Sequence, residues 1–99
     1  MRPLPHIKIT AENGETIPAD VLQNIKLLLG TRRGEMETDR AYGISWEAID
    51  KPLDEAMRMI NLDVVDQIEI YETRSRVTDV NFDAENPQGI SDVEVVVAV

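Results

Sequence analysis

The stretch SDVEVVVAV, residues Ser91–Val99, closes the sequence and decides the fold class. Every second residue is valine, and these valines line one face of a β-strand: Val93, Val95, Val97 and Val99. Asp92 and Glu94 begin the opposite face, but Val96 and Ala98 continue it. A strand that is apolar on both faces is normally covered or paired on both sides. We therefore expect an open edge of this strand to be completed by another polypeptide.

The residues before this strand predict its hairpin partner. Apolar and polar side chains alternate as in a half-buried strand: Val80, Phe82 and Ala84 against Asn81 and Asp83. ENPQG, residues 85–89, has the composition and length of a hairpin turn. Five acids belong to the hairpin, and we expect them to repel a second copy of it: Asp79, Asp83, Glu85, Asp92 and Glu94.

Helical periodicity precedes the hairpin. One apolar face predicts a first helix: Val21, Leu22, Ile25, Leu28 and Leu29. Pro18 suits its first turn, and Gly30 and Gly34 are its candidate stops. A second apolar face predicts a helix that begins near Asp50 and that Asn61 can end: Leu53, Ala56, Met57 and Ile60.

The stretch from Asp63 to Tyr71 is ambiguous. Asp63 is a good N-cap, and Val64, Ile68 and Tyr71 share a helical face, whereas IEIY alone can form a strand. We favour a short third helix. The predicted fold class is α+β, with two to three short helices packed on a small antiparallel sheet that ends in a C-terminal β-hairpin.

Residues 1–16 are expected to form an N-terminal extended arm, and residues 17–99 a single domain. Pro3 and Pro5 favour extended backbone, HIKIT at residues 6–10 can form one short strand, and Asn13-Gly14 is a turn signal. The 99 residues carry a net charge of -9, which disfavours nucleic acid and anionic membranes as partners. No apolar run is long enough for a signal peptide or a membrane span, so we expect a soluble protein. The absence of cysteine leaves the compartment open, with the cytoplasm as the default.

Candidate catalytic chemistry is sparse. The single histidine, His6, lies in the arm, and the chain has no cysteine. Glu35 with Asp39 or Asp50 is a conceivable carboxylate pair, but its surroundings are polar, so a solvated face is the better interpretation. Trp46 is expected to pack between the first two helices. We expect no enzyme activity, cofactor, metal or small-molecule substrate.

Two motifs resemble those of a known family. NIKLLLGTRRGEMETDRAYGISW, residues 24–46, and YETRSRVTDV, residues 71–80, are similar to the signature of the baseplate wedge and sheath-initiator family of contractile phage tails, also called the tail-lysozyme-like baseplate family. The first motif contributes Leu29, Thr31, Gly34, Glu35, Tyr42 and Gly43, and the second Tyr71, Glu72 and Arg74. Thr73 stands where the family has proline. The resemblance covers roughly residues 17–99.

This resemblance implies a structural role. Glu72, Arg74 and Arg76 are then expected to contact wedge proteins of the baseplate. Strands of the sheath subunit are expected to extend the hairpin and so start the first sheath ring, through residues on both of its strands: Val80, Phe82, Val93, Val95, Val96, Val97 and Val99. Six copies per particle, contacts with the tail tube, assembly in the bacterial cytoplasm and a final place in the baseplate of a virion or tail-like particle are also implied.

Two other functions stay open at this point. One is a peptidoglycan-cleaving muramidase of a tail baseplate, which the older family label suggests. The other is a small regulatory binding module that resembles bacterial anti-adaptors. The muramidase requires a carboxylate pair in a cleft, and the binding module does not require Glu72 and Arg74.

Overall fold

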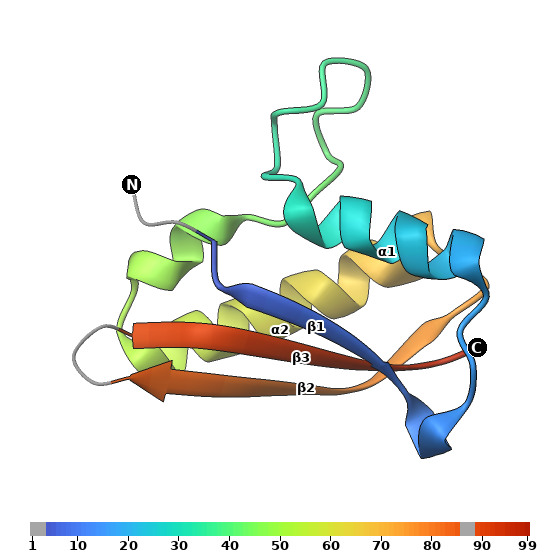
Figure 1. Cartoon of the computed structure of the whole chain (residues 1–99). Coiled ribbons are helices and arrows are strands. Elements are labelled where there is room, and N and C mark those ends of the chain that lie inside the picture. Colours follow the sequence, from blue (N-terminus) through green and yellow to red (C-terminus); the bar gives the residue numbers. More distant parts are fainter. Residues whose placement is uncertain (1–3, 86–88) are drawn as a thin grey trace.

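The computed structural model describes residues 4–85 and 89–99. Along the chain, strands (β), α-helices (α) and 3-10 helices (η) follow in this order: β1 (His6–Ala11), η1 (Glu12–Gly14), α1 (Ala19–Gly30), η2 (Trp46–Asp50), α2 (Leu53–Tyr71), β2 (Arg76–Glu85) and β3 (Gly89–Ala98). Figure 1 shows α1 and α2 lying together on one side of a three-stranded sheet. The predicted α+β class is confirmed.

The sheet has the order β1-β3-β2, so β3 is its central strand. β3 runs antiparallel to β2, with Phe82 opposite Val93, and parallel to β1, with Ile7 beside Val93. The sheet is therefore mixed rather than wholly antiparallel. The helices and β2 lie between β1 and β3 in the chain, and this long connection allows parallel pairing, whereas a tight hairpin joins only antiparallel strands.

The expectation that the last strand has an open edge is wrong. Residues 92–97 of β3 pair with β1 on one side, and the same strand pairs with β2 on the other. Both edges of β3 are thus paired within this chain, while its outer-face residues Val96 and Ala98 are half-buried. The outer strands of the sheet are β1 and β2.

The core lies between the sheet and the helices. Alternate residues of β3 are almost fully buried there, as the alternation predicts: Val93, Val95 and Val97. The helices contribute a buried stripe each: Val21, Ile25, Leu28 and Leu29 from α1, and Ala56, Ile60, Val64 and Ile68 from α2. Trp46 is buried in η2 and its Nε1 donates to the carbonyl oxygen of Leu29 at 2.9 Å. Burial of each large aliphatic side chain contributes about 1.5–3 kcal/mol.

The first helix is confirmed, but the second and third predicted helices are one. α1 ends at Gly30 and has Pro18 as its N-cap residue. α2 runs from Leu53 through Asn61 to Tyr71 without a break. Its buried residues keep the spacing of one helical face across Asn61, so ending the helix there would expose part of the core. Asparagine alone is too weak a helix-stop signal to offset that loss.

The N-terminal predictions are confirmed in part. HIKIT forms β1, and the turn that follows has positive φ at Asn13 (59°) and Gly14 (71°). The division into an arm of residues 1–16 and a domain of residues 17–99 stays a prediction, although β1 pairs within the sheet. The predicted turn at residues 85–89 falls largely on residues 86–88, which lie outside the described residues. None of the helices in the described ranges has the length and apolarity that crossing a membrane requires.

Candidate functional site

The free side of β2 is the first candidate surface. Within the described ranges, no strand of this chain pairs with β2 on the side away from β3. The backbone amide of Val80 donates to Oδ1 of Asp79 at 2.9 Å. The pairing of β2 with β3 shifts register between Val77 and Asp79, and again between Asp83 and Ala84. Bulges and charged side chains commonly protect an edge strand from pairing with other chains. β2 therefore has the features of a protected edge.

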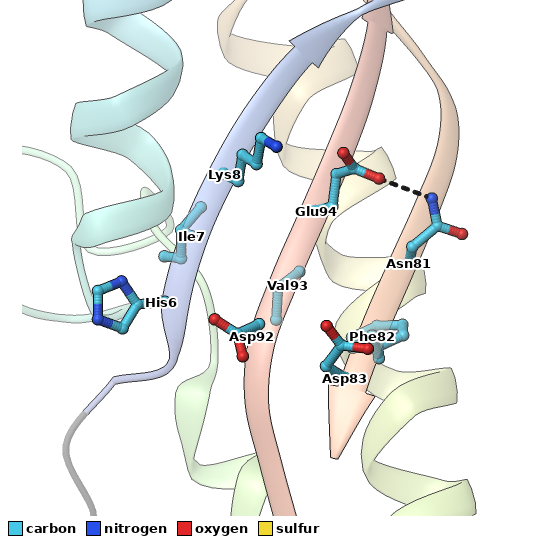
Figure 2. Close-up of a pocket in the computed structure, with 9 residues that line it drawn as sticks. All are labelled: His6, Ile7, Lys8, Asn81, Phe82, Asp83, Asp92, Val93 and Glu94. Atoms are coloured by element: carbon cyan, nitrogen blue, oxygen red, sulfur yellow. Dashed lines mark hydrogen bonds between the residues drawn. The ribbon is translucent and has the colours of Figure 1, made fainter.

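The solvent-facing side of the sheet is acidic and hollowed. His6, Asp92 and Asp83 form one row across β1, β3 and β2, and a hollow of about 560 Å³ lies over this region. Figure 2 shows the side chains of the neighbouring row, in which Asn81 donates to Glu94 at 3.1 Å. Carboxylates directly opposite each other in a sheet repel. Three of the acids predicted to discourage self-pairing line this hollow, namely Asp83, Asp92 and Glu94, and their effect stays a prediction.

Most side chains predicted to contact sheath strands are internal. Val93, Val95 and Val97 lie in the core with at most 1% exposure. Val80 and Phe82 are half-buried and pack against that core. On the outer face Val96 is half-buried, and Val99 after the strand is 50% exposed. A partner strand can therefore reach the hairpin through the β2 backbone, whereas the core valines are covered by this chain.

Glu72, from the second motif, points inward. It follows α2 and is 4% exposed. Its carboxylate accepts hydrogen bonds from Nδ2 of Asn24 at 3.1 Å and from Nε and Nη2 of Arg74 at 2.9 and 3.1 Å. The Arg74 guanidinium, assisted by Asn24, lowers the pKa of Glu72 below its usual value. Glu72 thus ties the end of α2 to α1.

Arg74 and Arg76 are on the surface. The side chain of Arg74 is half-exposed, and its Nη1 donates to Asp20 at the start of α1 at 2.6 Å. Hydrogen bonds to Glu72 and Asp20 raise the pKa of Arg74, and Arg74 in turn lowers the pKa of Asp20. Arg76 is exposed and opens β2 opposite Ala98. Of the three residues predicted to contact the wedge, two therefore present cations to solvent and one holds its neighbour in place.

The first motif closes the end of α1 into a loop. The Thr31 hydroxyl donates to the carbonyl oxygen of Leu27 at 2.6 Å, and Oε1 of Glu35 accepts from the amide of Arg32 at 3.0 Å. Gly34 has a φ of 94° and its carbonyl oxygen accepts from Arg40 at 2.8 Å. These contacts are all local, so this part of the motif shapes the loop.

Gly43 fixes the loop against α2. Its φ is 108°, and a Cβ at this position would lie 2.6 Å from the carbonyl oxygen of Thr31. The neighbouring amide of Ile44 donates to that same oxygen at 2.9 Å. The amide of Gly43 donates to Oε1 of buried Gln67 at 3.0 Å. Glycine is therefore required here by conformation and by space together.

Asp63 and a tyrosine pair complete this attachment. Asp63 was predicted as an N-cap, but it lies within α2, accepts from the amide of Ser45 at 2.7 Å and pairs with Arg33. Tyr42 and Tyr71 meet edge to face with ring centroids 4.9 Å apart. Burial raises the pKa of Tyr42, and a hydrogen bond to Asp39 is the largest cause that raises the pKa of Tyr71. Local sequence signals did not indicate these contacts of Asp63 and Gln67, because their partners are distant in the chain.

The conceivable carboxylate pair is used within the loop. Glu35 accepts from the backbone of Arg32, and Asp39 accepts from the amide of Ala41 at 3.1 Å and from Tyr71. Within the described part of the chain, no group of three or more His, Cys, Asp or Glu side chains is placed to hold a metal ion.

Comparison with protein families identifies the chain. The family model described as "Baseplate wedge protein gp25" matches residues 15–99, and the resemblance of the two motifs to a contractile-tail baseplate family is thereby confirmed. No curated protein matches the chain. The match includes both motifs, α1, α2 and the whole hairpin. The chain belongs to the baseplate wedge protein gp25 family.

Proposed function

We propose that this protein starts the sheath of a contractile tail by accepting a strand of the sheath subunit on the free edge of β2. Its family is one of structural baseplate proteins, so the chain is a baseplate component that contacts other baseplate components in the tail. The finer proposal concerns the partner and the mode of contact. β-Strand addition to an exposed sheet edge supplies affinity through main-chain hydrogen bonds.

The open edge of β2 is the observation that carries this proposal. The Val80 amide bonds to Asp79, a residue of its own strand. We infer that this amide faces away from β3, because successive amides of a strand point to opposite edges and ladder amides are occupied by the neighbouring strand. Each new main-chain hydrogen bond contributes about 0.5–1.5 kcal/mol. A partner strand along β2 (Arg76–Glu85) can form several, once Asp79 releases the amide.

The core supports this edge. The side chains of Val93, Val95 and Val97 pack in the core under the helices, and β3 pairs with β2. These valines then contribute to docking by fixing the position of β2, the strand to which the sheath strand adds. Val80 and Phe82 on β2 lie beside the incoming strand. A rigid strand loses little conformational freedom on pairing, which favours affinity.

Arg74 and Arg76 form the second part of the proposal. Their exposed cations lie where α2 turns into β2, and we assign them to contacts with acidic or backbone acceptors of wedge proteins. Glu72 positions Arg74 for this role. Six copies around the tail tube, and assembly in the bacterial cytoplasm before incorporation into a virion or tail-like particle, belong to the same proposal.

The experiment compares two substitutions at one edge residue. Val80→Ala shortens the side chain but keeps the amide, whereas Val80→Pro removes the amide that we place on the open edge. Proline at an outward-facing edge position loses no ladder hydrogen bond, so both variants should keep the wild-type circular dichroism spectrum. Each is co-expressed with the sheath subunit, which is then tested for co-purification.

We expect Val80→Ala to retain the sheath subunit and Val80→Pro to lose it. Equal retention by two folded variants would contradict addition at the β2 edge. Failure of the wild-type protein to retain the sheath subunit would contradict the role in sheath initiation itself.

A further inference from the structure

α2 carries a second, unassigned surface on its solvent-facing side. Three large apolar side chains are exposed there: Met59 (39%), Leu62 (61%) and Ile70 (61%). At about 100° per residue these positions fall within about 80° of one another around the helix, with Asp66 between them. The buried stripe of α2 lies on a different side. Exposed apolar groups on one side of a helix indicate an interaction surface more strongly than scattered ones do.

Two adjoining hollows follow this stripe. One, of about 410 Å³, is lined at its apolar positions by Ala41 and Ile70. The other, of about 270 Å³, is lined by Ala48, Met59 and Leu62. Both share Arg33, Asp63 and Asp66, so they form one groove between α2 and residues 33–48, which we call the α2 groove. Figure 1 shows part of this wall, the loop after α1, projecting beyond the helices.

The charges of the α2 groove are unbalanced. Arg33 is the one cation among the described residues that line it, and it is paired with Asp63. Asp66 and Glu69 are exposed and make no ion pair with any described residue. The groove therefore offers apolar positions at both ends and uncompensated negative charge between them, which complements a segment that carries apolar and basic side chains.

The backbone around the groove favours a helical occupant over a strand. The wall opposite α2 has its main chain occupied internally, since the amide of Arg33 donates to Ile44 at 2.9 Å and Ile44 donates to Thr31 at 2.9 Å. Strand addition needs a free edge, whereas a helix docks through side chains alone. Leu62 and Ile70 are eight residues apart, about 12 Å along the axis, so a helix of two to three turns spans both.

We propose that the α2 groove docks a basic amphipathic helix of a partner polypeptide. A second copy of this chain is a poorer occupant because its net charge of -9 repels an acidic groove. The residues that line the groove come from α2 and residues 33–48, and none belongs to β2, so the two proposed surfaces share no residue. This inference is independent of strand addition at β2.

The test uses two designed 18-residue helical peptides as probes, one with a leucine face flanked by lysine and one with the same face flanked by glutamate. Binding to the full chain is followed by fluorescence anisotropy and by amide NMR shifts. We expect the lysine peptide to bind and to shift amides of Leu62, Asp66 and Ile70, and the glutamate peptide to bind at least about fivefold more weakly. Equal binding of the two peptides, or absence of binding by both, overturns the proposal.

Matched variants locate the site. Leu62→Ser with Ile70→Ser should abolish binding of the lysine peptide, whereas Leu27→Ser, at an equally exposed position on α1, should leave it unchanged. Asp66→Lys with Glu69→Lys should weaken it by about fivefold or more. Asp83→Lys with Asp92→Lys changes the net charge equally on the outer face of the sheet and should not (Figure 2).

Two results would contradict the assignment. If the Leu27 variant lost as much affinity as the α2 variant, the groove would not be the site. If sedimentation showed a wild-type dimer that the Leu62 and Ile70 substitutions dissolve, the occupant would be a second copy of the chain.

Discussion

The loop that follows α1 and the turn that follows α2 both carry motif residues, but their polar groups face different ways. In the loop, Gly43 donates to Gln67, and this contact is buried. In the turn, Glu72 is buried but the guanidinium that binds it, Arg74, is half-exposed. The loop therefore uses its motif within the protein, whereas the turn uses a buried acid to hold a cation at the surface. The family match thus covers one motif that closes a loop and another whose cation we propose as a recognition group.

Gly43→Ala tests the loop side of this comparison and should have the largest effect. An added Cβ would lie 2.6 Å from the carbonyl oxygen of Thr31, at a φ of 108° that side chains rarely adopt. We expect a loss of about 3–4 kcal/mol in the free energy of unfolding, measured by urea denaturation. Gly30→Ala is the matched control, because an added Cβ there meets nothing within 4 Å. Equal urea midpoints for the two variants would show that the loop is not held tightly at Gly43.

Gln67→Leu tests the partner of Gly43. The substitution keeps an apolar body of similar size but leaves the Gly43 amide without its acceptor in a buried site. Such an unsatisfied donor costs about 1–3 kcal/mol. Gln23→Leu on the exposed side of α1 controls for the change from amide to aliphatic side chain. A wild-type urea midpoint for Gln67→Leu would mean that the loop finds another acceptor.

Glu72→Gln tests the buried half of the turn through its dependence on pH. The folded pKa of Glu72 is lowered, so its carboxylate contributes stability above the unfolded pKa of about 4.3, and that contribution is lost as pH falls through the lower folded pKa. We expect Glu72→Gln to cost about 1–2 kcal/mol at neutral pH and progressively less over the acid range in which the folded carboxylate takes up its proton. Urea midpoints across this range measure the difference, and a constant difference between the two proteins would exclude this origin.

The elements that could be predicted from the sequence are those whose buried residues follow a regular period. The alternation of Val93, Val95 and Val97 and the apolar stripe of α1 were recognisable because each element buries one face. The partners of a strand are not encoded in that way: Ile7 and Ile9 alternate identically whether β1 pairs in parallel or antiparallel fashion. The parallel pairing of β1 with β3, which closes the edge that we expected to be open, therefore became visible only in three dimensions.

The candidate site shows the same limit at the level of side chains. Glu72 and Arg74 were singled out from the motif, but the inward direction of Glu72 depends on Asn24, which is 48 positions earlier. Asp63 carried a local N-cap signal, yet its partners Arg33 and Ser45 are 30 and 18 positions away. Contacts between residues distant in the chain determine the positions of Glu72 and Asp63. The local propensities of these residues carry no information about such contacts.

Asp20→Asn should have the smallest effect of these substitutions. It separates the exposed contact of Arg74 with Asp20 from the contact of Arg74 with buried Glu72. Asp20 binds the exposed side of Arg74, and the pair is accessible to water and salt. Exposed ion pairs contribute little to stability, so the urea midpoint of Asp20→Asn should stay close to that of the wild type and well above that of Glu72→Gln. Because Glu72 still holds Arg74 in this variant, the cation stays in place for a partner. A loss as large as that of Glu72→Gln would mean that both carboxylates are structural, and the division between a buried anchor and a surface recognition group would fail.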